Sequence, residues 1–139
     1  FATTDDRNTL TLGRGEHSFA LLNLYPYTTG HAMVAPIRHA SDLAEVSVEA
    51  LTEMMATTKD IMAVLRDLYR PHGFNVGFNV GEAAGAGIEE HLHLHVVPRW
   101  RGDANMMTVV GGTRVIPEDL KVTHERMVGA LTGIRGELR

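Results

Sequence analysis

Short apolar segments broken by turn residues make up the first forty residues. Residues 9–14 and 18–23 alternate apolar and polar side chains on either side of a turn at Gly15, which is the pattern of a β-hairpin. Residues 31–36 are again largely apolar and end at Pro36, which favours a third strand that stops where proline removes a backbone donor. The start of the chain therefore predicts antiparallel β structure.

A helical period replaces this pattern after Ser47, whose side chain is suited to cap a helix. The apolar residues beyond it recur with the spacing of one helix face: Leu51, Met54, Met55, Ile61, Met62, Leu65 and Leu68. We expect a helix over residues 48–70 that ends before Pro71. Its methionines are more typical of core packing than of a cofactor site, because their flexible side chains fill irregular gaps.

Two further strands are expected beyond the helix, joined by a bend. Residues 74–80 and 91–97 carry strand patterns, and residues 81–87 between them are nearly all small. A third short strand is expected at residues 113–116. Because a short connection joins neighbouring strands, the first two are expected to pair antiparallel across the bend.

The end of the chain predicts a second helix. Pro117 fits the first helical position, and Glu118 and Asp119 fit the positive end of the helix dipole, so a helix is expected over residues 117–135. No repeat or linker divides the sequence. The whole pattern predicts a single α+β domain over residues 1–139, with an antiparallel five-stranded sheet, one long helix and a C-terminal helix.

Three histidines, His91, His93 and His95, stand at alternate positions in one of these strands. Alternate residues of a strand share one face, so the three imidazoles are expected on one side, with leucine and valine on the other. A single histidine on a strand face is commonly just half-buried. Three in register argue against chance, because like charges on one face repel, and they point to chemistry.

A metal site is one alternative for this cluster. Zinc binds imidazole nitrogens, and catalytic zinc sites often use three protein ligands. Three histidines on a straight strand span roughly 14 Å between the outer Cβ atoms, which is wide for one tetrahedral centre. A ligand from elsewhere, such as His31 or Glu90, would be needed. The sequence has no cysteine and no second cluster with metal-ligand spacing.

Nucleophilic attack on phosphorus is the favoured alternative. A neutral imidazole at His93 can attack a phosphoryl group while the rings of His91 and His95 donate hydrogen bonds to its oxygens. The bend supports this interpretation, because the glycines of residues 81–87 can adopt positive φ and turn main-chain N–H groups toward an anion. A bend directly before the histidines is therefore interpreted as a phosphate cradle.

Composition narrows the class of protein. A hydrophobic content of 44% over 139 residues allows one sizeable core, and a formal charge of −4 argues against a broad nucleic-acid surface. Neither an apolar stretch of about 20 residues nor a signal-peptide pattern is visible. A cytoplasmic protein is expected, with no membrane span and no nucleic-acid partner.

The motif His91-Leu-His-Leu-His-Val-Val97 resembles the signature of the histidine triad (HIT) family of nucleotide hydrolases and transferases. Residues 18–36 resemble the family's nucleoside-binding strand pair. Residues 98–113 are similar to the branch that cleaves dinucleoside polyphosphates, which includes bacterial diadenosine tetraphosphate phosphorylases. The resemblance implies an HIT-like fold and cleavage of a phosphoanhydride bond through a covalent nucleotidyl-histidine.

The resemblance also implies unequal roles for the histidines. His93 is the implied nucleophile, and the main-chain carbonyl of His91 accepts the proton on its other ring nitrogen. His95 contacts phosphate oxygens, and His31 supports the site from the neighbouring strand. These four residues are the implied catalytic set.

On the substrate side, the resemblance implies that Asn23 contacts the ribose and Leu22 the base. It implies phosphate contacts from Asn79 and from the loop residues Gly85, Ala86 and Gly87. Several family hydrolases carry a polar side chain in this loop, so one donor to the bridging phosphates is absent here. Arg99 either reaches the outer phosphates or caps its strand at the surface.

The resemblance implies partners as well as roles. These are nucleotides (an adenine dinucleoside polyphosphate, AMP, ADP or ATP) and a second copy of the chain, with residues 48–80 as the expected homodimer interface. No cofactor is required within the chain, and a divalent metal bound with the polyphosphate stays open. Three questions of function also stay open. The acceptor is either phosphate or water, the enzyme is alternatively a nucleoside phosphoramidase or AMP-lysine hydrolase, and the chain is alternatively a nucleotide-binding signalling module with incidental turnover.

Overall fold

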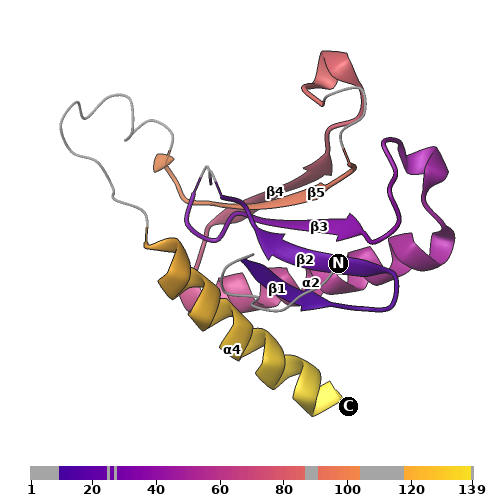
Figure 1. Cartoon of the computed structure of the whole chain (residues 1–139). Coiled ribbons are helices and arrows are strands. Elements are labelled where there is room, and N and C mark those ends of the chain that lie inside the picture. The colour runs from indigo at the N-terminus through magenta and orange to yellow at the C-terminus, as the bar shows by residue number, and fades with distance from the viewer. Residues whose placement is uncertain (1–9, 25, 27, 87–90, 104–117, 139) are drawn as a thin grey trace.

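Five antiparallel strands form one sheet, and two helices cover one of its faces (Figure 1). The computed structural model describes residues 10–24, 26, 28–86, 91–103 and 118–138. The elements in chain order are β1 (Thr11–Arg14), β2 (Ser18–Leu22), β3 (Ala32–Pro36), η1 (Leu43–Glu45), α2 (Val48–Tyr69), β4 (Gly73–Phe78), η2 (Glu82–Ala84), β5 (Leu94–Arg99) and α4 (Leu120–Leu138). The expected α+β class and its five-stranded antiparallel sheet are confirmed.

Strand β5 lies inside the sheet, whose order is β1-β2-β3-β5-β4. Met33 of β3 lies opposite His95 on one side, and Gly77 of β4 lies opposite the same histidine on the other. Ladders on both sides fix the twist and register of β5. The expected pairing of the two strands across the bend is confirmed, and β4 forms an edge of the sheet.

Helix α2 packs across the sheet, and Ser47 caps it as expected, with the side chain accepting from the Ala50 backbone N–H at 3.1 Å. The α2 residues with no exposed surface belong to the main hydrophobic core: Met54, Ile61 and Leu65. Burying each such side chain contributes about 1.5–3 kcal/mol. Met54 therefore serves packing, as expected, whereas Met55 faces outward and is 49% exposed.

Helix α4 begins later than the sequence predicts, at Leu120. Pro117 lies outside the described residues. The expectation that Glu118 and Asp119 lie in the first turn of α4 is wrong, because both residues precede the helix. The Asp119 side chain instead accepts a hydrogen bond from the backbone N–H of Lys121 in that turn. The Glu118 carboxylate is instead held by tertiary contacts, since it accepts hydrogen bonds from the side chains of Tyr69, Thr123 and Arg126.

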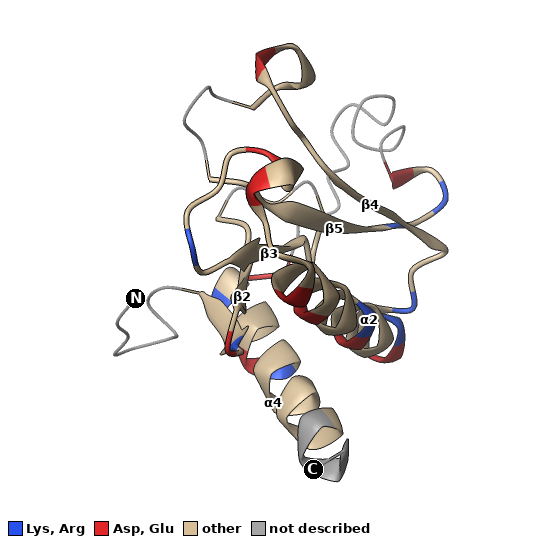
Figure 2. Cartoon of the chain, turned by 90° about the vertical axis from the view of Figure 1, so that its right-hand side faces the viewer, with Lys and Arg blue, Asp and Glu red and all other residues tan. Residues whose placement is uncertain are grey.

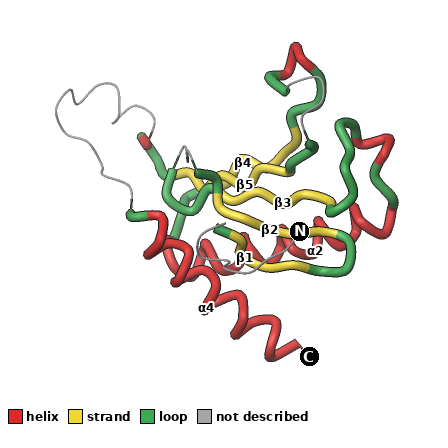
Figure 3. The backbone as a smooth tube through the Cα atoms, in the orientation of Figure 1, coloured by secondary structure: helices red, strands yellow, loops and turns green. Residues whose placement is uncertain are grey.

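The connection between β4 and β5 stands away from the helices, on the side of the sheet that they leave uncovered (Figure 3). The short strand expected at residues 113–116 lies outside the described residues, as does Gly87. Within the described residues, no helix is long and apolar enough to cross a lipid bilayer.

Candidate active site

The bend between β4 and β5 has the backbone conformation that its glycines allow. Gly81 has φ +86° and Gly85 has φ +100°, the positive values that glycine adopts readily. The backbone N–H groups of Gly85 and Ala86 donate to the carbonyls of Glu82 and Gly81 within the bend, so these two groups are not turned toward an anion. Gly85 and Ala86 line a small cavity together with Asn79 after β4, the residues His91, Leu92 and His93 before β5, and His95 within β5. The structure therefore brings the glycine bend, the polar end of β4 and the three histidines to one place.

The strand that carries the triad starts later than predicted. Pairing with β3 begins at Leu94, so His91 and His93 precede β5, and the expectation of a strand over residues 91–97 is wrong at its start. The alternation of faces nevertheless holds. Leu92 and Leu94 are each 2% exposed, whereas the three histidines are partly exposed on the other side.

Five imidazoles form a continuous row across this face. The ring centroids are 5.1 Å apart for His39 and His91, and 5.7 Å apart for His91 and His93. They are 6.5 Å apart for His93 and His95, and 5.3 Å apart for His95 and His31. His39 was not identified from the sequence, because it has no place in a periodic pattern. We call these five side chains the imidazole row.

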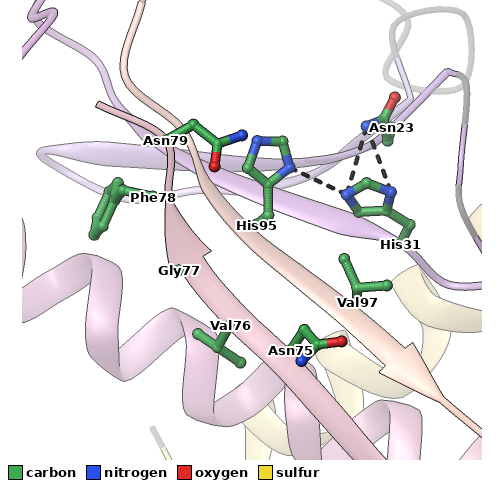
Figure 4. A pocket seen from close by; sticks show the side chains of 9 residues that line it. All are labelled: Asn23, His31, Asn75, Val76, Gly77, Phe78, Asn79, His95 and Val97. Carbon is green, nitrogen blue, oxygen red and sulfur yellow. Dashed lines mark hydrogen bonds between the residues drawn. The ribbon is translucent and has the colours of Figure 1, made fainter. Parts of the chain in front are cut away.

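One end of the imidazole row is buried. His31 is 1% exposed, and its Nε2 lies 3.1 Å from Nδ1 of His95. The amide nitrogen of Asn23 lies 3.5 Å from the His31 ring nitrogens (Figure 4). Burial, and secondly the neighbouring His95, lowers the pKa of His31 to about 4, so this ring is neutral near pH 7.

A neutral His31 carries one ring proton, so one of its ring nitrogens donates and the other accepts. In the tautomer in which the Asn23 amide donates to Nδ1 of His31, Nε2–H of His31 donates to Nδ1 of His95; in the other tautomer the hydrogen bond between the two rings runs the opposite way. In the first tautomer the proton of His95 sits on Nε2, which lies on the side of Asn79 (Figure 4). That tautomer presents one imidazole N–H donor toward the cavity beside His93.

The ring of His91 is hydrogen-bonded to backbone groups. Its Nε2 donates to the Pro36 carbonyl at 2.6 Å, and its Nδ1 accepts from the Ala40 N–H at 3.1 Å. Both ring nitrogens are therefore engaged, and the expectation that this ring donates to phosphate oxygens is wrong. His91 instead fixes the segment that follows β3 against the start of the triad.

A larger cavity of about 610 Å³ lies beside the buried end of the row. Its lining includes two alternate positions of β4, Asn75 and Gly77, and Asn79 directly after the strand, together with Asn23, His31, Val76, Phe78, His95 and Val97. Of the first three positions, only Asn79 was identified from the sequence. The same alternation that predicts the strand identifies the other two.

Leu22 does not lie at this cavity. It is 1% exposed and belongs to the hydrophobic core, so the expected contact with a base is wrong. Successive strand residues face opposite sides, and Asn23, which lines the cavity, directly follows it. Phe19 and Leu21 are the partly exposed residues of β2 that share the face of Asn23.

Arg99 is held at the end of β5. Its Nε and Nη2 donate to the Asp103 carboxylate at 2.7 and 2.8 Å, and its Nη1 donates to Oδ1 of Asn75 at 2.8 Å. Of the two alternatives for Arg99, these contacts favour the strand cap over the outer phosphates.

Charged side chains are scarce where the histidines gather. Figure 2 shows most Lys, Arg, Asp and Glu residues on the helices and loops, with β4 uncharged. Within strands β3, β4 and β5 the sole cation is Arg99. Anion binding at this face therefore depends on imidazole and side-chain amide N–H groups. Among the described residues, no group of three or more His, Asp or Glu is placed to hold a metal ion, and Glu90 lies outside them.

Comparisons with known proteins agree on one family. A model of the HIT domain matches residues 6–102. AP-4-A phosphorylase of Mycobacterium tuberculosis is 49% identical over 119 residues, 86% of this chain and 61% of that protein. Bis(5'-adenosyl)-triphosphatase of Dictyostelium discoideum is 32% identical over 88 residues, 63% of this chain and 58% of that protein.

Among solved structures, a zinc-bound histidine triad family protein from Mycobacterium smegmatis superposes with a TM-score of 0.73 at 27% identity. The match covers 92% of this chain and 87% of that one. The chain spans only 61% and 58% of the length of the two curated relatives described above.

Proposed function

The chain belongs to the HIT domain family, and we propose that it cleaves a phosphoanhydride bond of a dinucleoside polyphosphate by nucleotidyl transfer through His93. One observation carries the proposal: His93 stands in the middle of the imidazole row, at a cavity lined by the glycine bend. The 49% identity to an AP-4-A phosphorylase supports the choice of substrate class.

The proposed reaction has two displacements at one phosphorus. A ring nitrogen of neutral His93 bonds to the α-phosphorus of the substrate while the bond from that phosphorus to the leaving nucleoside polyphosphate breaks. An acceptor then attacks the same phosphorus, and the bond to His93 breaks. With diadenosine tetraphosphate, the first step releases ATP. Inorganic phosphate as acceptor then gives ADP, and water gives AMP.

The neighbours of His93 supply hydrogen-bond donors for the negative charge on the phosphoryl group. We propose that Nε2–H of His95 and the amide of Asn79 donate to the phosphoryl oxygens as charge develops on them. The small residues Gly85 and Ala86 leave room for a phosphate beside His93, while their backbone N–H groups donate within the bend to the carbonyls of Glu82 and Gly81. In the proposed pose, the carbonyl of His91 accepts the other ring proton of His93, which keeps the attacking nitrogen unprotonated.

The nucleoside half is proposed to occupy the larger cavity. Asn23 lies at its rim beside His31, where an amide can contact ribose hydroxyls. Since Leu22 is buried in the core, we propose that the base contacts the apolar side chains that line this cavity, Val76, Phe78 and Val97. The cavity of about 610 Å³ is within the range of small-molecule sites.

The decisive experiment identifies the products. The protein is incubated with diadenosine tetraphosphate, with and without inorganic phosphate, and the nucleotides are separated. ADP and ATP that appear only with phosphate indicate a phosphorylase, the acceptor favoured by the M. tuberculosis relative's name; AMP and ATP without phosphate indicate a hydrolase. A His93→Gly variant is expected to lose turnover yet keep nucleotide binding. Full activity in that variant contradicts the mechanism.

We further propose a cytoplasmic homodimer. Edge strand β4 is largely exposed, with Val76 at 42%, and an unpaired strand edge can extend a sheet into a second copy. The neighbouring α2 exposes Met55 at 49%. Light scattering after gel filtration is expected to give twice the chain mass, and Val76→Lys is expected to reduce it to the monomer. Cell fractionation tests the location.

A further inference from the structure

The residues directly before His31 hold its backbone between β5 and α2. The Thr28 hydroxyl donates to the Pro98 carbonyl of β5 at 2.7 Å, and the Thr28 carbonyl accepts from the His31 backbone N–H at 3.1 Å. Gly30 is buried so close to α2 that an added Cβ would lie 2.6 Å from Cδ2 of Leu65. The backbone that leads into His31 is therefore held on two sides.

The remaining residue of this loop connects it to the start of α4. Thr29 Oγ1 accepts a hydrogen bond from the backbone N–H of Glu118 at 3.1 Å, across 89 positions of sequence. Glu118 lies two residues before α4, and the proposed chemistry uses neither residue of this pair. The contact places a third element, α4, in control of the loop that ends at His31.

Glu118 is itself held firmly. Its carboxylate accepts three side-chain hydrogen bonds, from Tyr69 at 2.5 Å, Thr123 at 2.8 Å and Arg126 at 2.7 Å. Burial raises the pKa of Glu118, but these hydrogen bonds outweigh burial and lower the pKa, so the carboxylate is charged near pH 7. Hydrogen bonds to a charged group are stronger than neutral ones. The backbone N–H that Thr29 accepts is therefore fixed in place.

The ring of His31 depends on an accurate position. Its Nε2 lies 3.1 Å from Nδ1 of His95, and the amide nitrogen of Asn23 lies 3.5 Å from its ring nitrogens. A hydrogen bond weakens steeply beyond its normal range, so a displacement of about 0.5 Å is enough to lose the contact between the two rings. The loop before His31 must be held to within that distance.

We propose that Glu118 and Thr29 are positioning residues of the active site, which hold His31 at hydrogen-bond distance from His95. The inference rests on the proposed function and adds to it a link between α4 and the donor beside His93. His31 acts on the substrate only through His95. Loss of the link therefore weakens the donor as charge develops on the phosphoryl group, and leaves nucleotide binding nearly intact.

A pair of variants at one position tests the link. Thr29→Val keeps the size of the side chain but removes the acceptor oxygen, and Thr29→Ser keeps the hydroxyl. In Thr29→Val, kcat for diadenosine tetraphosphate is expected to fall about tenfold, with KM changed less than about twofold, and Thr29→Ser restores the wild-type kcat. Thr52→Val is the matched control, because the Thr52 hydroxyl donates at 2.8 Å to the Val48 carbonyl of its own helix. It is expected to keep the wild-type kcat.

Two outcomes of these assays overturn the inference. One is a wild-type kcat in Thr29→Val, and the other is an equal loss in Thr29→Ser. A double variant adds a third test. Glu118→Ala releases the carboxylate contacts and is expected to lower kcat, but Thr29→Val combined with Glu118→Ala loses no more than the larger single loss, because both act through one link. Losses that multiply mean independent routes and contradict the link.

The titration of His31 separates positioning from mere stabilisation and needs no catalysis. The His31 ring faces Asn23 of β2 and His95 of β5, and of these two only His95 titrates. NMR is expected to show the pKa of His31 near 4 in the wild type and higher by about 1 in Thr29→Val, because a looser loop admits water to the ring. An unchanged pKa overturns the inference.

The same titration keeps this inference distinct from the proposed function. A wild-type protein that cleaves no dinucleoside polyphosphate overturns the proposed function. The pKa of His31 in Thr29→Val, compared with Thr29→Ser and Thr52→Val, still decides whether Thr29 positions His31.

Discussion

The two ends of the imidazole row use the same side chain under opposite conditions. His31 is 1% exposed, hydrogen-bonded to His95, and its pKa is lowered to about 4. His39 is exposed and stacks on His91. A buried neutral ring keeps one pattern of donors and acceptors, whereas an exposed ring is accessible to a ligand from solvent. Burial thus fixes the charge state of His31 near pH 7, whereas His39 remains open to solvent.

The largest effect is expected at Gly30, directly before His31. Gly30 has φ +87°, and an added Cβ would lie 2.6 Å from Cδ2 of Leu65. Gly30→Ala combines backbone strain with overpacking, and we expect it to lower the free energy of unfolding by about 2–4 kcal/mol. Denaturation in urea measures this change.

Gly81→Ala is the matched control for that experiment. Gly81 has nearly the same φ, +86°, but an added Cβ meets nothing within 4 Å. Only backbone strain remains in this variant, so the free energy of unfolding is expected to fall by about 1 kcal/mol. Equal losses in the two variants would show that contact with Leu65 does not fix the buried end.

A pH dependence of stability is expected from His31. Its pKa is about 4 in the folded protein, below the ordinary histidine value of 6.5, so between these values the unfolded chain binds a proton that the folded protein does not. The stabilising contribution is complete above pH 6.5 and declines as the pH falls toward 4, by about 1.4 kcal/mol for each pKa unit. Urea midpoints across this range should decline less steeply in His31→Asn. Identical slopes contradict a buried neutral His31.

A smaller effect is expected between the two ends, at His91. His91→Ala removes hydrogen bonds to the Pro36 carbonyl and the Ala40 N–H, which costs about 1–3 kcal/mol. Hydrogen exchange of the Ala40 amide should accelerate. His39→Ala is the control, because stacking alone does not bond this amide. Equal acceleration in both variants would mean that His39, and not only His91, fixes this segment.

The smallest effect is expected at Arg99. Its ion pair with Asp103 is partly exposed and screened by solvent, so Arg99→Ala should lower the free energy of unfolding only slightly. Thermal unfolding at low and high salt measures this contribution. A much larger loss of unfolding free energy, similar to that expected for His31, would show that Arg99 helps to fix the site.

Local sequence patterns predicted most of the helices and strands. The features that these patterns missed depend on tertiary contacts. Alternation identified the sheet and the face shared by the histidines, and the cap at Ser47 identified the start of α2. Alternation also implies that Leu22 and Asn23 face opposite sides, a signal present in the sequence but not used. The start of β5 at Leu94 depends on pairing with Val34 of β3, which no local pattern contains.

Two further differences between the sequence-based expectations and the structure also arise from tertiary contacts. Glu118 was expected in a helix, but its carboxylate accepts hydrogen bonds from Tyr69 of α2 and from two α4 side chains, and α4 begins after it. His39 meets His91 because the segment after β3 is bonded to the start of the triad, through Pro36 and Ala40. Contacts between segments distant in sequence leave no periodic signal.

The central claim is that His93, between the two unlike ends of the row, carries the nucleotide. The direct test is rapid acid-free quenching during turnover of diadenosine tetraphosphate without inorganic phosphate, followed by digestion and mass spectrometry of the peptide that contains residues 91–99. We expect one AMP adduct, located on His93, that disappears when phosphate is added before the quench. An adduct on another histidine, or turnover with no adduct on any histidine, would contradict the account.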